Sequence, residues 1–138
     1  MKDWFIATFS SNPLNTKVAR GIVKSFLMQH AVPEEDVWDL EIAVNEALTN
    51  VIRHTYKNER DKTIKLSIFW NEGEVEIFIR DYGEHVDPRS LQPKPPDPER
   101  EGGFGLYIIH KVFDSVQFLN VCRGNLLILK KKLRGRLP

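Results

Sequence analysis

Blocks of apolar and polar residues predict a strand followed by a helix at the start of the chain. Residues 4–10, "WFIATFS", are mostly aromatic or β-branched and run into a turn-forming Ser-Ser-Asn-Pro sequence, which is typical of a short strand. From about Asn15 to Ala31 apolar residues recur at helical spacing, and Pro33 then interrupts the pattern. The predicted core face of this helix carries Val18, Ile22 and Phe26, with Val23 and Leu27 beside it.

A second helix is predicted from Glu34 to about Tyr56. Three acidic residues occupy its first turn, where negative charge is favourable against the helix dipole. Its predicted buried stripe consists of Val37, Leu40, Val44, Ala47, Leu48 and Val51. The polar residues Glu46, Asn50 and His54 form a separate row, because residues four apart on a helix lie within about 40° of one another. Taken alone, such a row is more typical of a solvent-facing surface than of a functional site.

The second half of the chain predicts two hairpins and one more helix. Residues 63–70 and 74–83 alternate apolar and polar positions around an "NEG" turn, as half-buried strands do. A helix is predicted to begin at about Gly103, and its core face carries Leu106, Ile109 and either Val112 or Phe113. Residues 115–121 and 125–133 then predict a closing hairpin around "CRGN".

The segment between residues 87 and 102 is predicted to be a long loop. Five of the eight prolines lie between Pro88 and Pro98, which disfavours a regular element there. A loop of this length inside a compact domain usually has a function, such as that of a lid over a site.

This order of elements predicts an α+β fold. Strands joined by hairpins pair antiparallel, and all three helices can cover one face of the sheet. We therefore expect a two-layer sandwich with a mixed, mostly antiparallel sheet. A chain of 138 residues is long enough for one sizeable core, so residues 1–138 are expected to form a single domain.

Composition narrows the class of protein. The chain is 41% hydrophobic and 28% charged with a net charge of +1, so no global field recruits nucleic acid or a membrane surface. A single cysteine, Cys122, cannot form an internal disulfide and is expected to be a half-buried structural thiol. No apolar run approaches the ~18–20 residues of a membrane span, and we expect a cytoplasmic protein.

Three motifs remain to be explained. The first is the polar row on the second helix. The second is Asp81 at the end of a strand with Gly83 two residues later, where a carboxylate can accept from an amino group and the glycine permits close approach. The third is Gly102, Gly103 and Gly105 at a helix start, where unpaired N–H groups suit phosphate oxygens.

Each motif also has an ordinary structural explanation. Asp and Gly are common turn formers, and a Gly-x-Gly pair often does no more than open a helix. The glycines match neither a P-loop nor a dinucleotide-binding fingerprint. In a two-layer sandwich, however, all three motifs would converge on one site, where Asn can also offer an oxygen to Mg²⁺.

Together the motifs resemble those of the Bergerat-fold ATPases, the superfamily that includes gyrase, histidine kinases and mismatch-repair proteins. The N-box of this superfamily is matched by Glu46, Asn50 and His54. Its first glycine box is matched by Asp81 and Gly83, and its second by Gly103, Gly105 and Leu106. Within the superfamily the chain looks most like the small anti-sigma-factor serine/threonine kinases. That likeness covers nearly the whole length.

The resemblance implies ATP binding with Mg²⁺ and transfer of the γ-phosphoryl group to a serine or threonine of an anti-sigma-factor antagonist. It also implies binding of a sigma factor, and we expect a homodimer. In such a family Glu46 would be the general base, a role typically worth about 10²–10⁴-fold in rate. Asn50 would coordinate the metal, and Asp81 would bind the adenine amino group. Gly103 and Gly105 would contact the phosphates.

The sequence alone leaves several alternatives open. Arg100 either pairs with the γ-phosphate when a lid at about 87–102 closes or is a solvated loop charge. Val86 and Asp87 could together fill the place of the hydrophobic–Asp pair that continues the first glycine box, with an unsettled register. His54 either supports the nucleotide site or completes a hydrogen-bond network. The alternative function is a non-catalytic nucleotide-binding module that acts by partner exchange, and a regulatory domain related to larger phosphatases or sensors is a third possibility.

Overall fold

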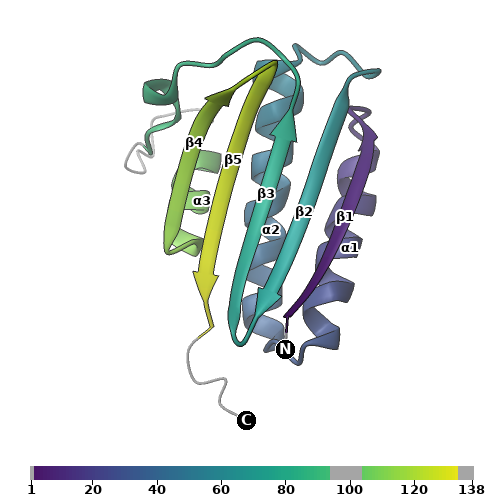
Figure 1. Cartoon of the computed structure of the whole chain (residues 1–138), viewed down its shortest axis with the longest axis vertical. Helices are drawn as coiled ribbons and strands as arrows, with labels where there is room; N and C mark the ends of the chain where they lie inside the picture. The colour runs from purple at the N-terminus through teal and green to yellow at the C-terminus, as the bar shows by residue number, and fades with distance from the viewer. Residues whose placement is uncertain (1, 94–103, 134–138) are drawn as a thin grey trace.

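The computed structural model describes residues 2–93 and 104–133, which form a sheet with helices packed against one face (Figure 1). The strands are β1 (Lys2–Ser10), β2 (Thr63–Asn71), β3 (Glu74–Asp81), β4 (Ser115–Val121) and β5 (Gly124–Lys132). The α-helices are α1 (Asn15–Gln29), α2 (Glu34–Asn50) and α3 (Phe104–Val112). Two short elements, a π-helix η1 (Val51–Thr55) and a 3₁₀-helix η2 (Pro88–Leu91), follow α2 and β3. No helix in these described ranges is long and apolar enough to cross a membrane.

The sheet has the strand order β1-β2-β3-β5-β4. All four pairings among the described strands are antiparallel, so the expectation of a mixed sheet is corrected. The chain reaches β4, at one edge, through α3 and returns along β5, which lies next to β3. In this register Asp81, the last residue of β3, lies between Ile64 of β2 and Asn125 of β5.

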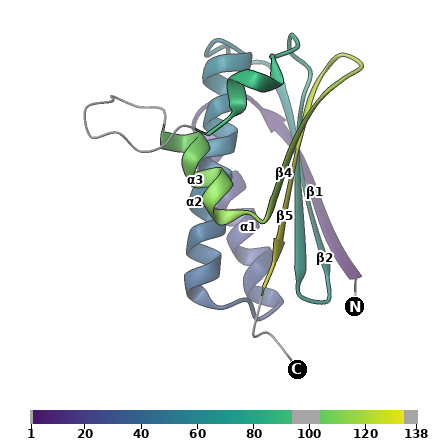
Figure 2. The ribbon, with the colours of Figure 1, turned by 90° about the vertical axis from the view of Figure 1, so that its left-hand side faces the viewer.

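The core lies between the two layers, which are seen edge-on in Figure 2. The whole predicted stripe of α2 is buried, and of the two alternatives after Ile109 it is Phe113 that is buried. The inward positions of the central strands are buried as well: Ile64, Leu66, Ile68, Val75, Ile77 and Ile79. The α+β two-layer sandwich expected from the sequence is therefore confirmed.

The predicted core face of α1 needs a correction. Val23, Phe26 and Leu27 are buried as expected, but Val18 is 61% exposed and Ala19 takes its place in the core. The helix lies behind the edge strand β1 (Figure 1) and packs mainly against α2, so only a narrow stripe is covered. Apolar spacing identified the helix correctly, but it could not show how much of its surface a neighbour covers.

The hairpin turns are set by backbone conformations that favour glycine. The "NEG" turn between β2 and β3 is confirmed, with positive φ at Glu72 (48°) and Gly73 (86°), as in the preferred two-residue hairpins. In the β4–β5 turn Gly124 has a φ of 133°, and a Cβ there would overlap the carbonyl oxygen of Asp81. The expectation of a half-buried thiol is wrong, because Cys122 is exposed at this turn.

Candidate functional site

The end of α2 changes from an α-helix to a π-helix at the predicted site. The wider turn is closed by a hydrogen bond from Tyr56 N–H to the carbonyl of Val51, at 2.9 Å. Such π turns are rare and often occur at functional sites. The sequence predicted a regular helix to about Tyr56, so this is a correction. At the end of the turn His54 is exposed, while Tyr56 is buried.

Tyr56 anchors the π turn to two strands. Its hydroxyl donates to the carbonyl of Thr63 at 2.5 Å and accepts from the N–H of Tyr82 at 2.7 Å. The first bond reaches the start of β2 and the second reaches the segment after β3. The end of the helical layer is thereby fixed against the end of the sheet where Asp81 lies.

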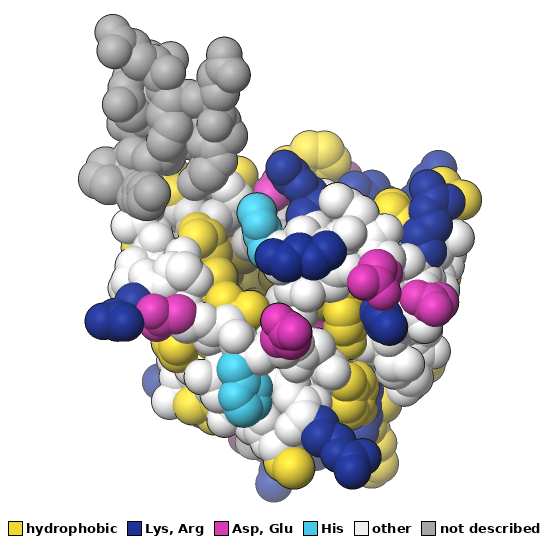
Figure 3. All heavy atoms as spheres, turned by 90° about the horizontal axis from the view of Figure 1, so that it is seen from above, with side chains coloured by type: hydrophobic (Ala, Val, Ile, Leu, Met, Phe, Trp, Pro, Cys, Tyr) yellow, Lys and Arg dark blue, Asp and Glu magenta, His cyan; other side chains and the backbone are white. Residues whose placement is uncertain are grey.

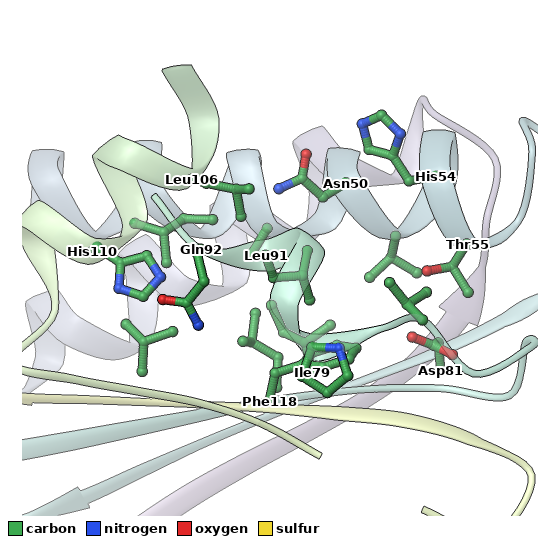
Figure 4. Close-up of a pocket in the computed structure, with 17 residues that line it drawn as sticks. Asn50, His54, Thr55, Ile79, Asp81, Leu91, Gln92, Leu106, His110 and Phe118 are labelled. Atoms are coloured by element: carbon green, nitrogen blue, oxygen red, sulfur yellow. The ribbon is translucent and has the colours of Figure 1, made fainter. Parts of the chain in front are cut away.

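A cavity of about 150 Å³ opens between this helix end, the sheet, η2 and α3 (Figure 4). A cavity of similar size in another protein binds benzene, so the scale suits a flat ring. The lining is mostly apolar, with a few polar groups from separate elements. The polar or titratable lining residues are Asn50, His54, Thr55, Asp81, Gln92 and His110.

Asp81 supplies a buried carboxylate at one end of this cavity, near Thr55, while Gln92 and His110 lie toward the other end (Figure 4). Asp81 is only 1% exposed. Burial raises the pKa of Asp81, and hydrogen bonds from the side chain of Asn125 and the N–H of Gly83 oppose that rise. A carboxyl with a pKa perturbed by burial, at the end of an apolar cavity, is a typical candidate for ligand recognition.

Gly83 permits the close approach of the π turn to the segment after β3. A Cβ at Gly83 would lie 2.5 Å from Cγ2 of Thr55 and 3.2 Å from the ring of Tyr56. Its N–H donates to Oδ1 of Asp81 at 3.1 Å. The glycine therefore holds the carboxylate through its N–H group, and it does not line the cavity itself.

Glu46 lies beside the first turn of α3. The half-buried glutamate is one helical turn before Asn50, and a Cβ at Gly105 would lie 2.6 Å from its Oε2. A carboxylate at the start of a helix is favourable because the unpaired N–H groups there carry partial positive charge. Leu106, the next residue of α3, lines the cavity together with Asn50.

The structure brings most of the predicted site residues together. One cavity is lined by four of them: Asn50, His54, Asp81 and Leu106. Glu46 does not line this cavity but lies beside Gly105, the residue before Leu106. The ring of His54 lies on the side of the helix away from Asp81 (Figure 4). The predicted positions Arg100 and Gly103, and most of the predicted lid, lie outside the described residues.

The two residues expected to continue the first glycine box, Val86 and Asp87, have different surroundings in the structure. Val86 lines the cavity. Asp87 instead caps η2, where its carboxylate accepts from the N–H of Arg89 at 2.9 Å and pairs with the Arg89 guanidinium. The side-chain hydrogen bond from Arg89 lowers the pKa of Asp87. Of this pair, Val86 thus lines the cavity and Asp87 does not.

Sequence reasoning missed Thr55 and Asn125. Thr55 lies in the segment where the helix becomes a π-helix, which apolar spacing does not reveal. Asn125 could have been found from the sequence, because it points to the same face of β5 as Leu127 and Leu129. A polar residue on a buried face needs hydrogen-bond partners. It is fully buried, and its amide bonds to Asp81.

The few protein oxygens at the cavity fit a magnesium ion that is coordinated mainly by water and by the phosphates of a bound ligand. Among residues 2–93 and 104–133, no cluster of three or more His, Cys, Asp or Glu side chains could enclose a metal. Mg²⁺ usually keeps several waters and takes one or two protein oxygens plus phosphates. Asn50, on the cavity wall, offers one such oxygen.

Viewed from the end of the sheet that carries Asp81, the molecule shows a hollow with apolar side chains inside it (Figure 3). Histidine, basic and acidic side chains stand around this hollow. An apolar interior with a charged rim suits a ligand that has a flat apolar part and a charged part.

The sequence matches the histidine kinase-like ATPase domain family over residues 9–131. It is 31% identical over 126 residues to a serine-protein kinase RsbW of Oceanobacillus iheyensis, covering 86% of this chain and 80% of that protein. It is 33% identical over 140 residues to an anti-sigma F factor of Priestia megaterium, covering 96% and 95%. The fold is similar to that of a crystal structure of RsbU and RsbW domains from Mycobacterium tuberculosis, with a TM-score of 0.69, 15% identity, and coverage of 95% of this chain and 32% of that chain.

Proposed function

The chain belongs to the histidine kinase-like ATPase domain family, and we propose that it is an ATP-dependent serine/threonine protein kinase that also binds a sigma factor. Its phosphoryl acceptor in this proposal is an anti-sigma-factor antagonist protein. Relatives named as a serine-protein kinase and as an anti-sigma factor support both halves of the proposal. The whole chain, residues 1–138, acts as one such domain.

One contact carries the catalytic half of the proposal. The carboxylate of Glu46 is held against Gly105, one helical turn before Asn50. Helix geometry therefore keeps a proton acceptor next to a metal-binding oxygen. A module that only binds nucleotide has no need of a carboxylate in that place.

The proposal gives each site residue a role, which rests on its position where the structure describes it and on the family resemblance for Arg100 and Gly103. Asp81 accepts from the exocyclic amino group of adenine, and the apolar walls of the cavity hold the ring. Gly105 and Leu106, with Gly103 before them, place the start of α3 against the phosphates. Arg100 pairs with the γ-phosphate when the lid closes. Gly83 shapes the adenine end by admitting Thr55.

The reaction relies mainly on positioning and charge. Glu46 accepts the proton of the attacking serine or threonine hydroxyl. At the same time the hydroxyl oxygen bonds to the γ-phosphorus, and the bond between the γ-phosphorus and ADP breaks. The side-chain oxygen of Asn50 would hold Mg²⁺, which when bound offsets negative charge on the phosphates. His54, exposed and turned from Asp81, completes the rim rather than the reaction centre.

The proposal includes a cytoplasmic homodimer that uses α1 and β1. Large apolar side chains are exposed on these neighbouring elements, including Phe5 at 49% and Val18 at 61%. Both line one shallow groove between the strand and the helix. Exposed apolar side chains grouped in this way commonly mark an interface.

The direct test is transfer of labelled phosphate. The chain is incubated with Mg²⁺, γ-labelled ATP and candidate antagonist proteins encoded near its gene, and phosphoserine and phosphothreonine are measured on each candidate. We expect one candidate to be labelled. ATP binding without transfer to any candidate, together with partner exchange, would favour the non-catalytic alternative.

A further inference from the structure

We propose that Asn125 is the positioning residue of the adenine end of the site: its amide fixes Asp81 and the segment after β3, Glu84–Val86, as one unit. The inference rests on the proposed function and assigns a residue that the sequence motifs do not include. It follows from four hydrogen bonds that meet on one fully buried side chain.

All the hydrogen-bonding capacity of this amide is used. Nδ2 donates to Oδ1 of Asp81 at 3.0 Å and to the carbonyl of Glu84 at 2.9 Å. Oδ1 accepts from the N–H of Val86 at 3.2 Å and from Nδ2 of Asn120 at 2.9 Å. An asparagine amide has two donor hydrogens and an oxygen with two lone pairs, so no capacity is left over.

The partners fix the orientation of the amide. The exchange of its oxygen and nitrogen would set an N–H group against the N–H of Val86 and an oxygen against the carboxylate of Asp81. Both pairings are repulsive, so only one orientation fits. Asn120 supports the same arrangement from β4, because it also donates to the carbonyl of Val86 at 3.0 Å.

This arrangement couples two parts of the site that the chain itself joins only loosely. Asp81 recognises the ring in the proposal, and Val86 lines the same cavity. Between them the chain makes a turn whose carbonyl at Glu84 and N–H at Val86 are both held by Asn125. A shift of Asn125 would therefore move the carboxylate and the cavity wall together.

The preference for ATP over GTP is a measurement that distinguishes a positioning role of Asn125 from a merely structural one. Adenine presents an amino group where guanine presents a carbonyl oxygen. A carboxylate held in place as an acceptor favours the first and rejects the second. Loss of positioning is therefore expected to reduce the preference for ATP over GTP, whereas general destabilisation would weaken both equally.

Asn125→Asp tests the donor directly with almost no change of shape. The new carboxylate faces Asp81, so one of the two must hold a proton for the pair to be accommodated. The other titratable groups near Asp81 are Tyr56 on the helical side and Arg80 on its own strand. His54 is on the cavity lining, but its ring is turned away from Asp81. The ratio of wild-type to variant affinity for ATP is expected to rise with pH, because the second carboxyl of the pair ionises as pH rises.

The experiment measures binding of Mg-ATP and Mg-GTP by calorimetry at a series of pH values from acidic to alkaline. Asn120→Ala is the second variant, since it removes an exposed support and leaves Asp81 and Asn125 in place. It is expected to weaken ATP binding about 3- to 10-fold, because the two hydrogen bonds that Asn120 donates, to Oδ1 of Asn125 and to the carbonyl of Val86, are both lost at an exposed position. Asn71→Ala, at an exposed asparagine at the far end of β2, is the matched control and should bind as wild type.

The outcomes separate the inference from the proposed function. Wild-type protein that binds no ATP would overturn both. Wild-type binding together with unchanged affinity and unchanged ATP preference in Asn120→Ala and Asn125→Asp would overturn the inference alone. Equal losses for ATP and GTP would do the same. If Asn125→Asp fails to fold by circular dichroism, Asn120→Ala decides the question.

Discussion

Glu46 and Gly105 are in direct contact across two helices: a Cβ at Gly105 would lie 2.6 Å from Oε2 and 3.5 Å from Cδ of the glutamate. The contact joins α2, which carries Asn50, to the start of α3. The proposed base and the proposed phosphate-binding turn are therefore set relative to each other by packing rather than by a flexible loop.

Gly105→Ala is expected to displace the Glu46 carboxylate and to slow phosphoryl transfer about 10²-fold, the effect of a misplacement of about 1 Å. Transfer rates at saturating ATP measure this effect. Gly21→Ala is the matched control, because nothing lies within 4 Å of a Cβ at that helical glycine. The control should keep its rate and gain about 0.4–1 kcal/mol of stability. Equal rates in both variants would show that the Glu46–Gly105 contact is irrelevant to catalysis.

Gly83→Ala is expected to destabilise the fold by about 1–3 kcal/mol, because the new methyl group overlaps Cγ2 of Thr55. Thr55→Ser removes that carbon while keeping the hydroxyl. The double variant should therefore recover part of the loss, though the ring of Tyr56 also lies close. Urea unfolding midpoints of the two single variants and the double variant measure the coupling. Strictly additive effects would contradict the close packing of the π turn on Gly83.

Asp81→Asn is expected to lose ATP affinity while gaining stability in the apo protein at neutral pH. The pKa of Asp81 is raised in the fold, so the folded state binds its proton more tightly than the unfolded chain does. Wild-type stability therefore falls as pH rises from the ordinary value of 3.8 through the raised pKa, and Asn at this position removes that fall.

The measurement is chemical unfolding of both proteins across acidic and neutral pH, beside calorimetry with ATP. The lowered pKa values of Asp3 and Asp87 act with the opposite sign but are common to both proteins. The difference curve thus isolates Asp81. Unchanged ATP affinity in the variant would refute the adenine role.

The proposed homodimer predicts sedimentation above the monomer mass at micromolar concentration. Val18→Lys on α1 should shift the protein toward monomer, because a charge would have to be buried at the interface. Leu119→Lys is the control, since Leu119 is 43% exposed on β4, at the opposite edge of the sheet from β1. A wild-type monomer, or equal effects of both variants, would argue against an interface at α1 and β1.

The sequence predicted more of the fold than of the site's detail. Period-two strands and the stripe of α2 were predicted well, because each half-buried element shows its period in its own residues. The exposure of Val18 depends on what covers α1, which no local pattern contains. The π turn at Val51–Thr55 ends at Tyr56, whose partners lie on β2 and in the segment after β3, and no local pattern contains such partners.

Within the site, motif residues were easier to find than their supports. Asp81 and Gly105 belong to recognisable spacings, whereas Asn125 follows a turn glycine and resembles ordinary turn chemistry. Its importance comes from residues far away in the chain, among them Asp81. Its place among the inward-facing, alternate positions of β5 is the sequence feature that would have identified it.

The central claim is that Glu46 acts as the base of a protein kinase. The most direct measurement compares wild type and Glu46→Gln for ATP affinity and for phosphoryl transfer to the antagonist protein that the wild type labels. We predict nearly unchanged ATP binding, because Glu46 does not line the cavity, and a loss of transfer of about 10²–10⁴-fold. Full transfer activity in Glu46→Gln would contradict the account.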